Sequence, residues 1–166
     1  MQTKMLRPFL TVVLLASGVA AVAGGGADVL GKAGWGLISP KGGADLTRAA
    51  GGVLHAVVRV AASKYYQTQL THDVAEAVPA GTTLLYKFSA RSASKNPIHV
   101  VIEKREAPYT HHLDQIVALT GDWKPYSFKT TIPKAYGAGE LAARLQLGQQ
   151  AGQVDFKDIA VVKVDK

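Results

Sequence analysis

The stretch Thr82-Thr83-Leu84-Leu85-Tyr86-Lys87-Phe88-Ser89-Ala90-Arg91 has the two-residue period of a β-strand. One set of alternate positions holds Leu84, Tyr86, Phe88 and Ala90, and the other holds Leu85, Lys87, Ser89 and Arg91. Successive side chains of a strand point to opposite faces of its sheet, so the first set is expected in a core and the second outside it.

Similar segments recur along the chain, separated by turn formers such as Gly51-Gly52, Pro79-Ala80-Gly81 and Gly121-Asp122. We predict nine strands near 44–49, 53–60, 65–74, 82–92, 98–106, 113–119, 125–132, 140–147 and 153–164. Residues 140–149 contain good helix formers, but Leu141, Ala143 and Leu145 alternate with their neighbours, which favours a strand. Many short strands divided by turns are typical of an all-β sandwich or barrel.

The composition fits one globular domain without cysteine chemistry. The chain has 166 residues, of which 48% are hydrophobic and 19% charged. That length supports one domain with a substantial core. Because there is no Cys, disulfides, thiolate zinc sites and a Cys nucleophile are all excluded.

Residues 1–23 have the pattern of a cleaved signal peptide. Lys4 and Arg7 precede an apolar run over 9–23, which ends in the small-x-small sequence Ala21-Val22-Ala23. A run of 15 residues is short for a membrane-spanning helix, so an uncleaved anchor is the weaker alternative. We therefore expect a secreted or periplasmic protein in which 24–34 form a flexible leader and 35–166 the folded domain.

The charge pattern does not indicate a nucleic-acid partner. Of 19 basic residues, 17 remain after cleavage against 12 acidic ones, a net charge of +5. The basic residues are scattered singly rather than clustered, which is typical of a soluble surface. Attraction to an acidic polysaccharide is a further hypothesis. Stable membrane insertion is not expected after cleavage.

Period two places a group of polar and planar side chains on outward faces. They are Tyr65, Gln67, Gln69, Arg91, His99, Glu103, Arg144 and Gln146. Amides, guanidinium and carboxylate groups are suited to sugar hydroxyls, and an aromatic ring can stack on the apolar face of a pyranose. Exposed strand faces are commonly polar in any soluble protein, which is the competing explanation.

Seven collinear motifs resemble the carbohydrate-binding modules of families four and nine. They begin with Tyr65-Tyr66-Gln67-Thr68-Gln69-Leu70, Pro79-Ala80-Gly81 and Leu85-Tyr86-Lys87-Phe88-Ser89-Ala90-Arg91, and continue with Asn96-Pro97-Ile98-His99-Val100. The order ends with Leu119-Thr120-x-x-Trp123-Lys124-x-Tyr126-x-Phe128, Ala143-Arg144-Leu145-Gln146-Leu147-Gly148 and Gly152-Gln153-Val154-Asp155-Phe156-Lys157-Asp158-Ile159. The matching extends from about Trp35 to Val164.

The resemblance implies a jelly-roll β-sandwich that binds β-glycans and is often attached to a glycoside hydrolase. It places Tyr65 and Gln69 at ligand contacts and Trp35 and Trp123 at packing positions. The tryptophan that many members carry before the Gln strand is absent, since Ser63, Lys64 and Tyr65 stand there. Asp158 matches a calcium-ligand position, although a partner acid is not evident near residues 28–34.

No catalytic constellation can be assembled. His111 and His112 are adjacent, and Glu103 and Glu106 are three apart, so on a strand each pair points to opposite faces. Nucleophile-elbow, zinc-protease and phosphate-loop motifs are absent.

The leading hypothesis is a secreted non-catalytic module for β-glucan, xylan or a similar polysaccharide or oligosaccharide, with no required cofactor. The alternative is an extracellular structural or interaction protein that uses the same sandwich for contacts with an unknown protein partner.

Overall fold

A computed structural model describes residues 26–164 of the protein. The predicted signal peptide lies outside the described residues. The described residues form ten strands and two short 3-10 turns, η1 (Ala50–Gly52) and η2 (Tyr65–Gln67). The strands are β1 (Gly36–Ile38), β2 (Ala44–Arg48), β3 (Leu54–Val58), β4 (Gln69–Asp73), β5 (Thr83–Arg91), β6 (Pro97–Lys104), β7 (His111–Ala118), β8 (Lys124–Thr131), β9 (Leu141–Gln146) and β10 (Gly152–Val164).

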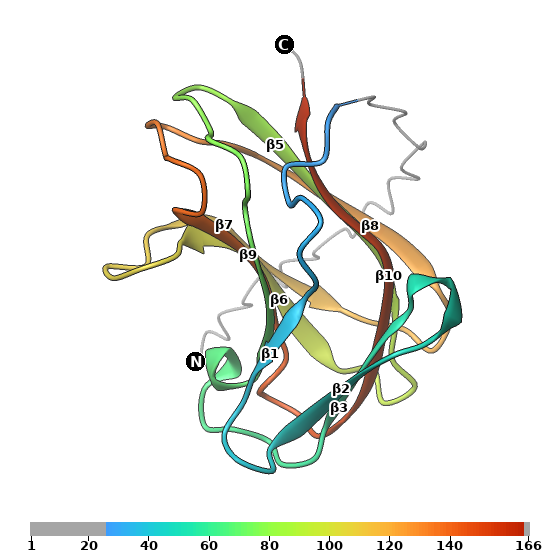
Figure 1. Cartoon of the computed structure of the whole chain (residues 1–166). Helices are drawn as coiled ribbons and strands as arrows, with labels where there is room; N and C mark the ends of the chain where they lie inside the picture. Colours follow the sequence, from blue (N-terminus) through green and yellow to red (C-terminus); the bar gives the residue numbers. More distant parts are fainter. Residues whose placement is uncertain (1–25, 165–166) are drawn as a thin grey trace, which may run out of the picture.

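The strands form two five-stranded antiparallel sheets that pack face to face (Figure 1). One sheet has the order β1-β4-β9-β6-β7 and the other β2-β3-β10-β5-β8. We call them the first and the second sheet. All nine predicted strands are present, and the predicted jelly-roll β-sandwich is confirmed.

The core lies between the sheets and follows the predicted alternation. Leu84, Tyr86, Phe88 and Ala90 of β5 are all buried. The Phe88 ring packs against Tyr86 and Phe156, with ring centroids 5.8 and 6.0 Å away. Each such side chain contributes about 1.5–3 kcal/mol through its burial. Burial also raises the pKa of the Tyr86 hydroxyl well above its ordinary value.

The segment expected to be a flexible leader is packed against the sandwich where the structure describes it. Val29 and Leu30 are buried in the core. Asp28 forms a β-bridge with Val162, and its carboxylate accepts hydrogen bonds from the N–H groups of Leu30 and Val161. The expectation of a flexible leader was wrong because this segment, although it begins with glycines, contains two aliphatic residues that pack in the core.

Two local features differ from the sequence-based expectation. Residues 65–67 form the 3-10 turn η2 instead of the start of a strand, and β1 was not predicted because only three of its residues pair. Both features lie at the same sheet edge, since β1 pairs with β4, the strand that follows η2. They shape one side of the candidate site.

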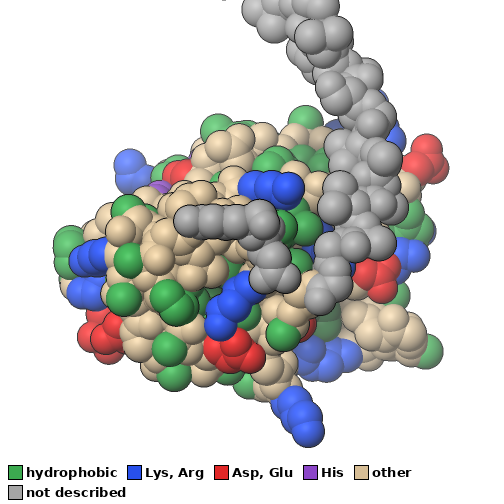
Figure 2. All heavy atoms as spheres, turned by 90° about the horizontal axis from the view of Figure 1, so that it is seen from above, with side chains coloured by type: hydrophobic (Ala, Val, Ile, Leu, Met, Phe, Trp, Pro, Cys, Tyr) green, Lys and Arg blue, Asp and Glu red, His purple; other side chains and the backbone are tan. Residues whose placement is uncertain are grey.

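Charges are interspersed at the end of the sandwich near the C-terminus. Seen from this end, Lys and Arg side chains alternate with acidic ones and form no single basic cluster (Figure 2). Among residues 26–164 no helix is long and apolar enough to cross a membrane.

Candidate functional site

On the outer face of the first sheet, polar side chains from four strands lie side by side in rows of paired residues. One row crosses all five strands and consists of Ile38, Gln69, Gln146, His99 and Ile116. The next row consists of Gly36, Thr71, Arg144, Val101 and Asp114, and the third of Asp73, Ala142, Glu103 and His111. Adjacent strands are about 4.8 Å apart, so each five-stranded row extends about 19 Å across the sheet.

The centre of the first row contains two polar atoms without a partner. Gln146 donates a hydrogen bond from Nε2 to Oε1 of Gln69 over 3.3 Å. Within residues 26–164, Gln146 Oε1 and His99 Nε2 are buried and form no hydrogen bond. Most buried polar groups in proteins are paired, and an unpaired one costs about 1–3 kcal/mol. These two atoms lie on directly paired residues, and both are acceptors when His99 is neutral and donates from Nδ1 to Asp114, so one water or two hydroxyls could satisfy them.

Most charged side chains of the other two rows contact one another. Arg144 and Glu103 form an ion pair in which both side chains are less than a tenth exposed. His111 Nε2 lies 2.8 Å from Glu103, and His111 Nδ1 lies 3.0 Å from Asp114. Asp114 is also 3.2 Å from His99 Nδ1. The network therefore fixes both the orientation of His99 and the nitrogen that it leaves free.

Tyr65 lies directly over His99. The two rings are parallel within 6°, with centroids 3.8 Å apart. The turn that carries Tyr65 rests on Gly148, whose N–H donates to the Tyr65 carbonyl over 3.0 Å. A Cβ at Gly148 would lie 2.7 Å from the carbonyl oxygens of both Lys64 and Tyr65. Glycine at this position thus allows the close approach that places Tyr65 on the sheet.

A hollow of about 360 Å³ adjoins these rows on the β1 side. Its polar lining includes Thr71, Asp73, Arg105 and Arg144, and Gly34 and Gly36 also line it. Arg144 Nη1 donates to Thr71 Oγ1 over 3.3 Å, and Arg105 is 3.4 Å from Asp73. Exposed aliphatic side chains flank the polar rows at both sheet edges, with Ile38 46% and Ile116 69% exposed.

The protein is similar to several solved carbohydrate-binding modules. With a family 4 carbohydrate-binding module the TM-score is 0.68, at 22% sequence identity over 78% of this chain and 86% of that one. With the N-terminal cellulose-binding domain of Cellulomonas fimi β-1,4-glucanase C it is 0.63, at 21% identity over 80% and 90% of the chains. The second such domain of that enzyme gives 0.62 at 16% identity, over 86% and 94%.

The chain has the fold of a family 4 carbohydrate-binding module. The identities are low, so the likeness concerns the fold. No protein-family profile and no curated protein matches the sequence.

In this family 4 fold, most of the predicted site residues meet on the first sheet. Gln69, His99, Glu103, Arg144 and Gln146 lie on its outer face, and Tyr65 covers it from η2. Gln67 sits in the same turn, but its Oε1 accepts hydrogen bonds from Ser63 Oγ and the Lys64 N–H, both over 3.0 Å. The Gln67 side chain therefore stabilises the turn through these hydrogen bonds.

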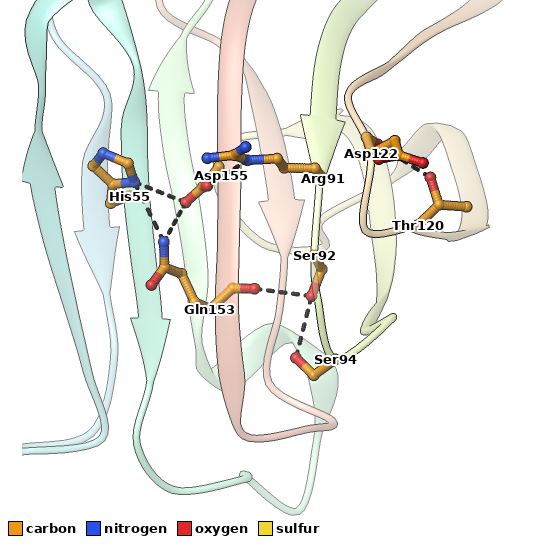
Figure 3. A network of polar contacts seen from close by, with 8 residues as sticks. All are labelled: His55, Arg91, Ser92, Ser94, Thr120, Asp122, Gln153 and Asp155. Atoms are coloured by element: carbon orange, nitrogen blue, oxygen red, sulfur yellow. Dashed lines mark hydrogen bonds and ion pairs between the residues drawn. The ribbon is translucent and has the colours of Figure 1, made fainter.

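Arg91 lies apart from the other predicted site residues. It lies on β5 in the second sheet, where its Nε is 2.8 Å from Asp155. Figure 3 shows Arg91, His55 and Gln153 converging on this carboxylate. Burial alone raises the pKa of Asp155, but hydrogen bonds from Gln153, His55 and Arg91 outweigh it and hold the pKa below its ordinary value. Alternation along one strand could not reveal which sheet the strand joins.

The two tryptophans and the adjacent histidines lie in different surroundings. Trp35 is packed in the core, whereas Trp123 is half-buried and lies between Arg91 and Lys157. His111 and His112 point apart, because His112 contacts the Tyr136 hydroxyl at 2.8 Å.

Asp158 is exposed on a bulge of β10. Among the described residues no three His, Asp or Glu side chains are grouped to hold a metal ion. Calcium binding stays an untested prediction.

Sequence reasoning missed several residues of the site, namely Ile38, Thr71, His111, Asp114 and Ile116. A register shift between Ile102 and Glu103 places His111 opposite Glu103, which uninterrupted alternation would not do. His111 and Asp114 are three residues apart, and regular alternation would place them on opposite faces, so their contact had no signal in the sequence.

Proposed function

We propose that this protein is a secreted, non-catalytic module that binds a neutral β-linked polysaccharide, such as a β-glucan or xylan, across the outer face of the first sheet. The observation that carries the proposal is the unpaired, buried pair of Gln146 Oε1 and His99 Nε2. Sugar hydroxyls both donate and accept hydrogen bonds, so they can satisfy an amide oxygen and an imidazole nitrogen together.

The surroundings of this pair favour an extended ligand. The row from Ile38 to Ile116 crosses five strands, or about 19 Å, and has a polar centre with aliphatic ends. A polysaccharide lying along the row would meet polar groups with its hydroxyls and aliphatic side chains with its C–H faces. A single sugar would use only part of it.

The charges of the site favour a neutral ligand. Arg144, Glu103, His111 and Asp114 are engaged with one another, so a carboxylate on the ligand would have to disrupt an existing pair. Because Tyr65 lies over His99, the ligand reaches His99 Nε2 after the Tyr65 side chain moves aside. Tyr65 then lies beside the sugar, where its ring can stack.

The described surface gives less support to a protein-interaction role. Its exposed large hydrophobic residues include Ile38 and Ile116, which lie at opposite edges of the same sheet. A protein-contact patch generally needs contiguous apolar area of several hundred Å². This alternative becomes the preferred one if no polysaccharide binds.

Affinity electrophoresis tests the proposal. The purified protein is run in gels that contain xylan, mixed-linkage β-glucan, hydroxyethyl cellulose or mannan, beside the Gln69→Ala, Gln146→Ala double variant. Gln115→Ala serves as control, because Gln115 is an exposed glutamine on β7 outside the rows. Retardation by a neutral polymer that is lost only in the double variant supports the proposal. Absence of retardation by every polymer contradicts it.

A further inference from the structure

The outer face of the second sheet carries one basic side chain in each of four successive register rows. Lys129 pairs opposite Leu85, Lys87 opposite Ser127, Lys157 opposite Ser89, and Arg91 opposite Asp155. These residues alternate with core positions of β5, β8 and β10, so their side chains point outward. Rows two residues apart are separated by about 6.8 Å, and the four cations therefore extend over about 20 Å.

Three of these cations lack a carboxylate partner. Within residues 26–164, Lys87, Lys129 and Lys157 form no ion pair. Arg91 shares Asp155 with His55, so one carboxylate faces two potential cations there. Asp158 is a further acid close by, and it lines a hollow together with Lys87, Lys129 and two serines. The four basic side chains outnumber these two acids, so this row of side chains carries a net positive charge.

The indole ring of Trp123 lies at one end of this row of basic side chains. The Trp123 ring centroid lies 4.8 Å from Arg91 Cζ and 4.7 Å from Lys157 Nζ, and the indole is only half-buried. Cations held beside an exposed indole combine a site for a carboxylate with a stacking surface for a sugar ring. The predicted site residue Arg91 belongs to this arrangement.

We propose that the outer face of the second sheet is a second ligand surface, which binds an acidic polysaccharide. Carboxylates repeated along the polymer pair with Lys129, Lys87 and Lys157, and one sugar ring lies against Trp123. Duplex nucleic acid carries one charge per about 1.7 Å of helix axis, far denser than one cation per about 6.8 Å, so the spacing fits the sparser polyanion better. The surface is opposite the one assigned to a neutral glycan and does not depend on it.

Affinity electrophoresis at low and high salt tests this surface. The probes are polygalacturonate and its fully methyl-esterified form, which has the same sugar chain without its charge. The purified protein is compared with Lys87→Ala, Lys129→Ala, Lys157→Ala, and with the control triple variant Lys32→Ala, Lys41→Ala, Lys134→Ala. The control loses the same charge at exposed lysines elsewhere on the surface.

We expect polygalacturonate to retard the protein at low salt and the first triple variant to bind roughly tenfold more weakly, since each exposed charge contributes modestly. Added salt should weaken the binding, and the esterified polymer should not retard the protein. Equal loss in both triple variants, no retardation by polygalacturonate, or equally strong retention of a DNA duplex would each overturn the proposal. Retardation by neutral polymers is tested with the Gln69→Ala, Gln146→Ala variant, and its outcome is independent of the result with polygalacturonate.

Discussion

The Tyr65 ring lies flat on the His99 imidazole, 3.8 Å away between centroids, and joins the η2 turn to β6 of the first sheet. His99 is itself held by Asp114 on its other nitrogen. The Tyr65 ring thus covers an imidazole whose Nε2 is buried without a hydrogen-bond partner among the described residues. The stability of this contact and its role in binding can be separated by substitution.

Tyr65→Ala should destabilise the protein modestly and strongly reduce glycan binding. An aromatic stack contributes about 0.5–1.5 kcal/mol beyond buried area, so urea unfolding should show a loss of that order. Tyr65→Phe keeps the ring and should retain both stability and most of the affinity. An alanine variant that binds the glycan as well as the unmodified protein would show that Tyr65 only packs.

Gly148→Ala should displace the turn that holds Tyr65. Its Cβ would lie 2.7 Å from two backbone oxygens, which have no flexible end to move aside. We expect a destabilisation of about 1–3 kcal/mol, typical of overpacking, together with weaker glycan binding. Gly121→Ala is the matched control, because a Cβ there meets nothing within 4 Å. Thermal unfolding that shows equal stability for the two variants would contradict the expected clash.

Alternation allowed the strands and most of the site to be predicted, because burial of one face imposes period two on each strand. It gave the outward set Gln69, His99, Glu103, Arg144 and Gln146, all of which lie on one sheet. Arg91 obeys the same alternation on the other sheet, since local pattern does not encode which distant strands pair. The position of His111 depends on a bulge, and the position of Tyr65 depends on a contact between its turn and Gly148. Neither feature produces a periodic pattern in the sequence.

The buried ion pair on the outer face of the first sheet should respond far more to substitution than an exposed pair nearby. Glu103→Gln leaves the Arg144 guanidinium buried beside a neutral amide, which should cost about 3–5 kcal/mol. Asp73→Asn breaks the half-exposed pair with Arg105 and should cost less than about 1 kcal/mol. Urea unfolding at neutral pH measures both. Similar small losses in the two variants would mean that Glu103 is solvated in solution.

The Asp155 carboxylate should make stability depend on pH in the acid range. Because its pKa is lowered in the folded protein, folding favours the ionised form, and the resulting stabilisation is complete above the unfolded pKa of about 3.9. It is lost as the pH falls through the lower, folded pKa. Asp155→Asn removes it by weakening the contacts with His55 and Arg91, so the variant should be less stable at pH 7 by about 1.5–3 kcal/mol.

Urea unfolding of both proteins from pH 7 to pH 2.5 gives the decisive comparison. Once Asp155 is protonated in the unmodified protein, the two curves should converge, since both then carry a neutral group at this position. Asp45→Asn is a suitable control, because Asp45 pairs with Arg59 at a half-exposed position on the same sheet and should shift stability little. A difference between the unmodified protein and Asp155→Asn that stays constant down to pH 2.5 would show that shape, and not charge, is what Asp155 contributes.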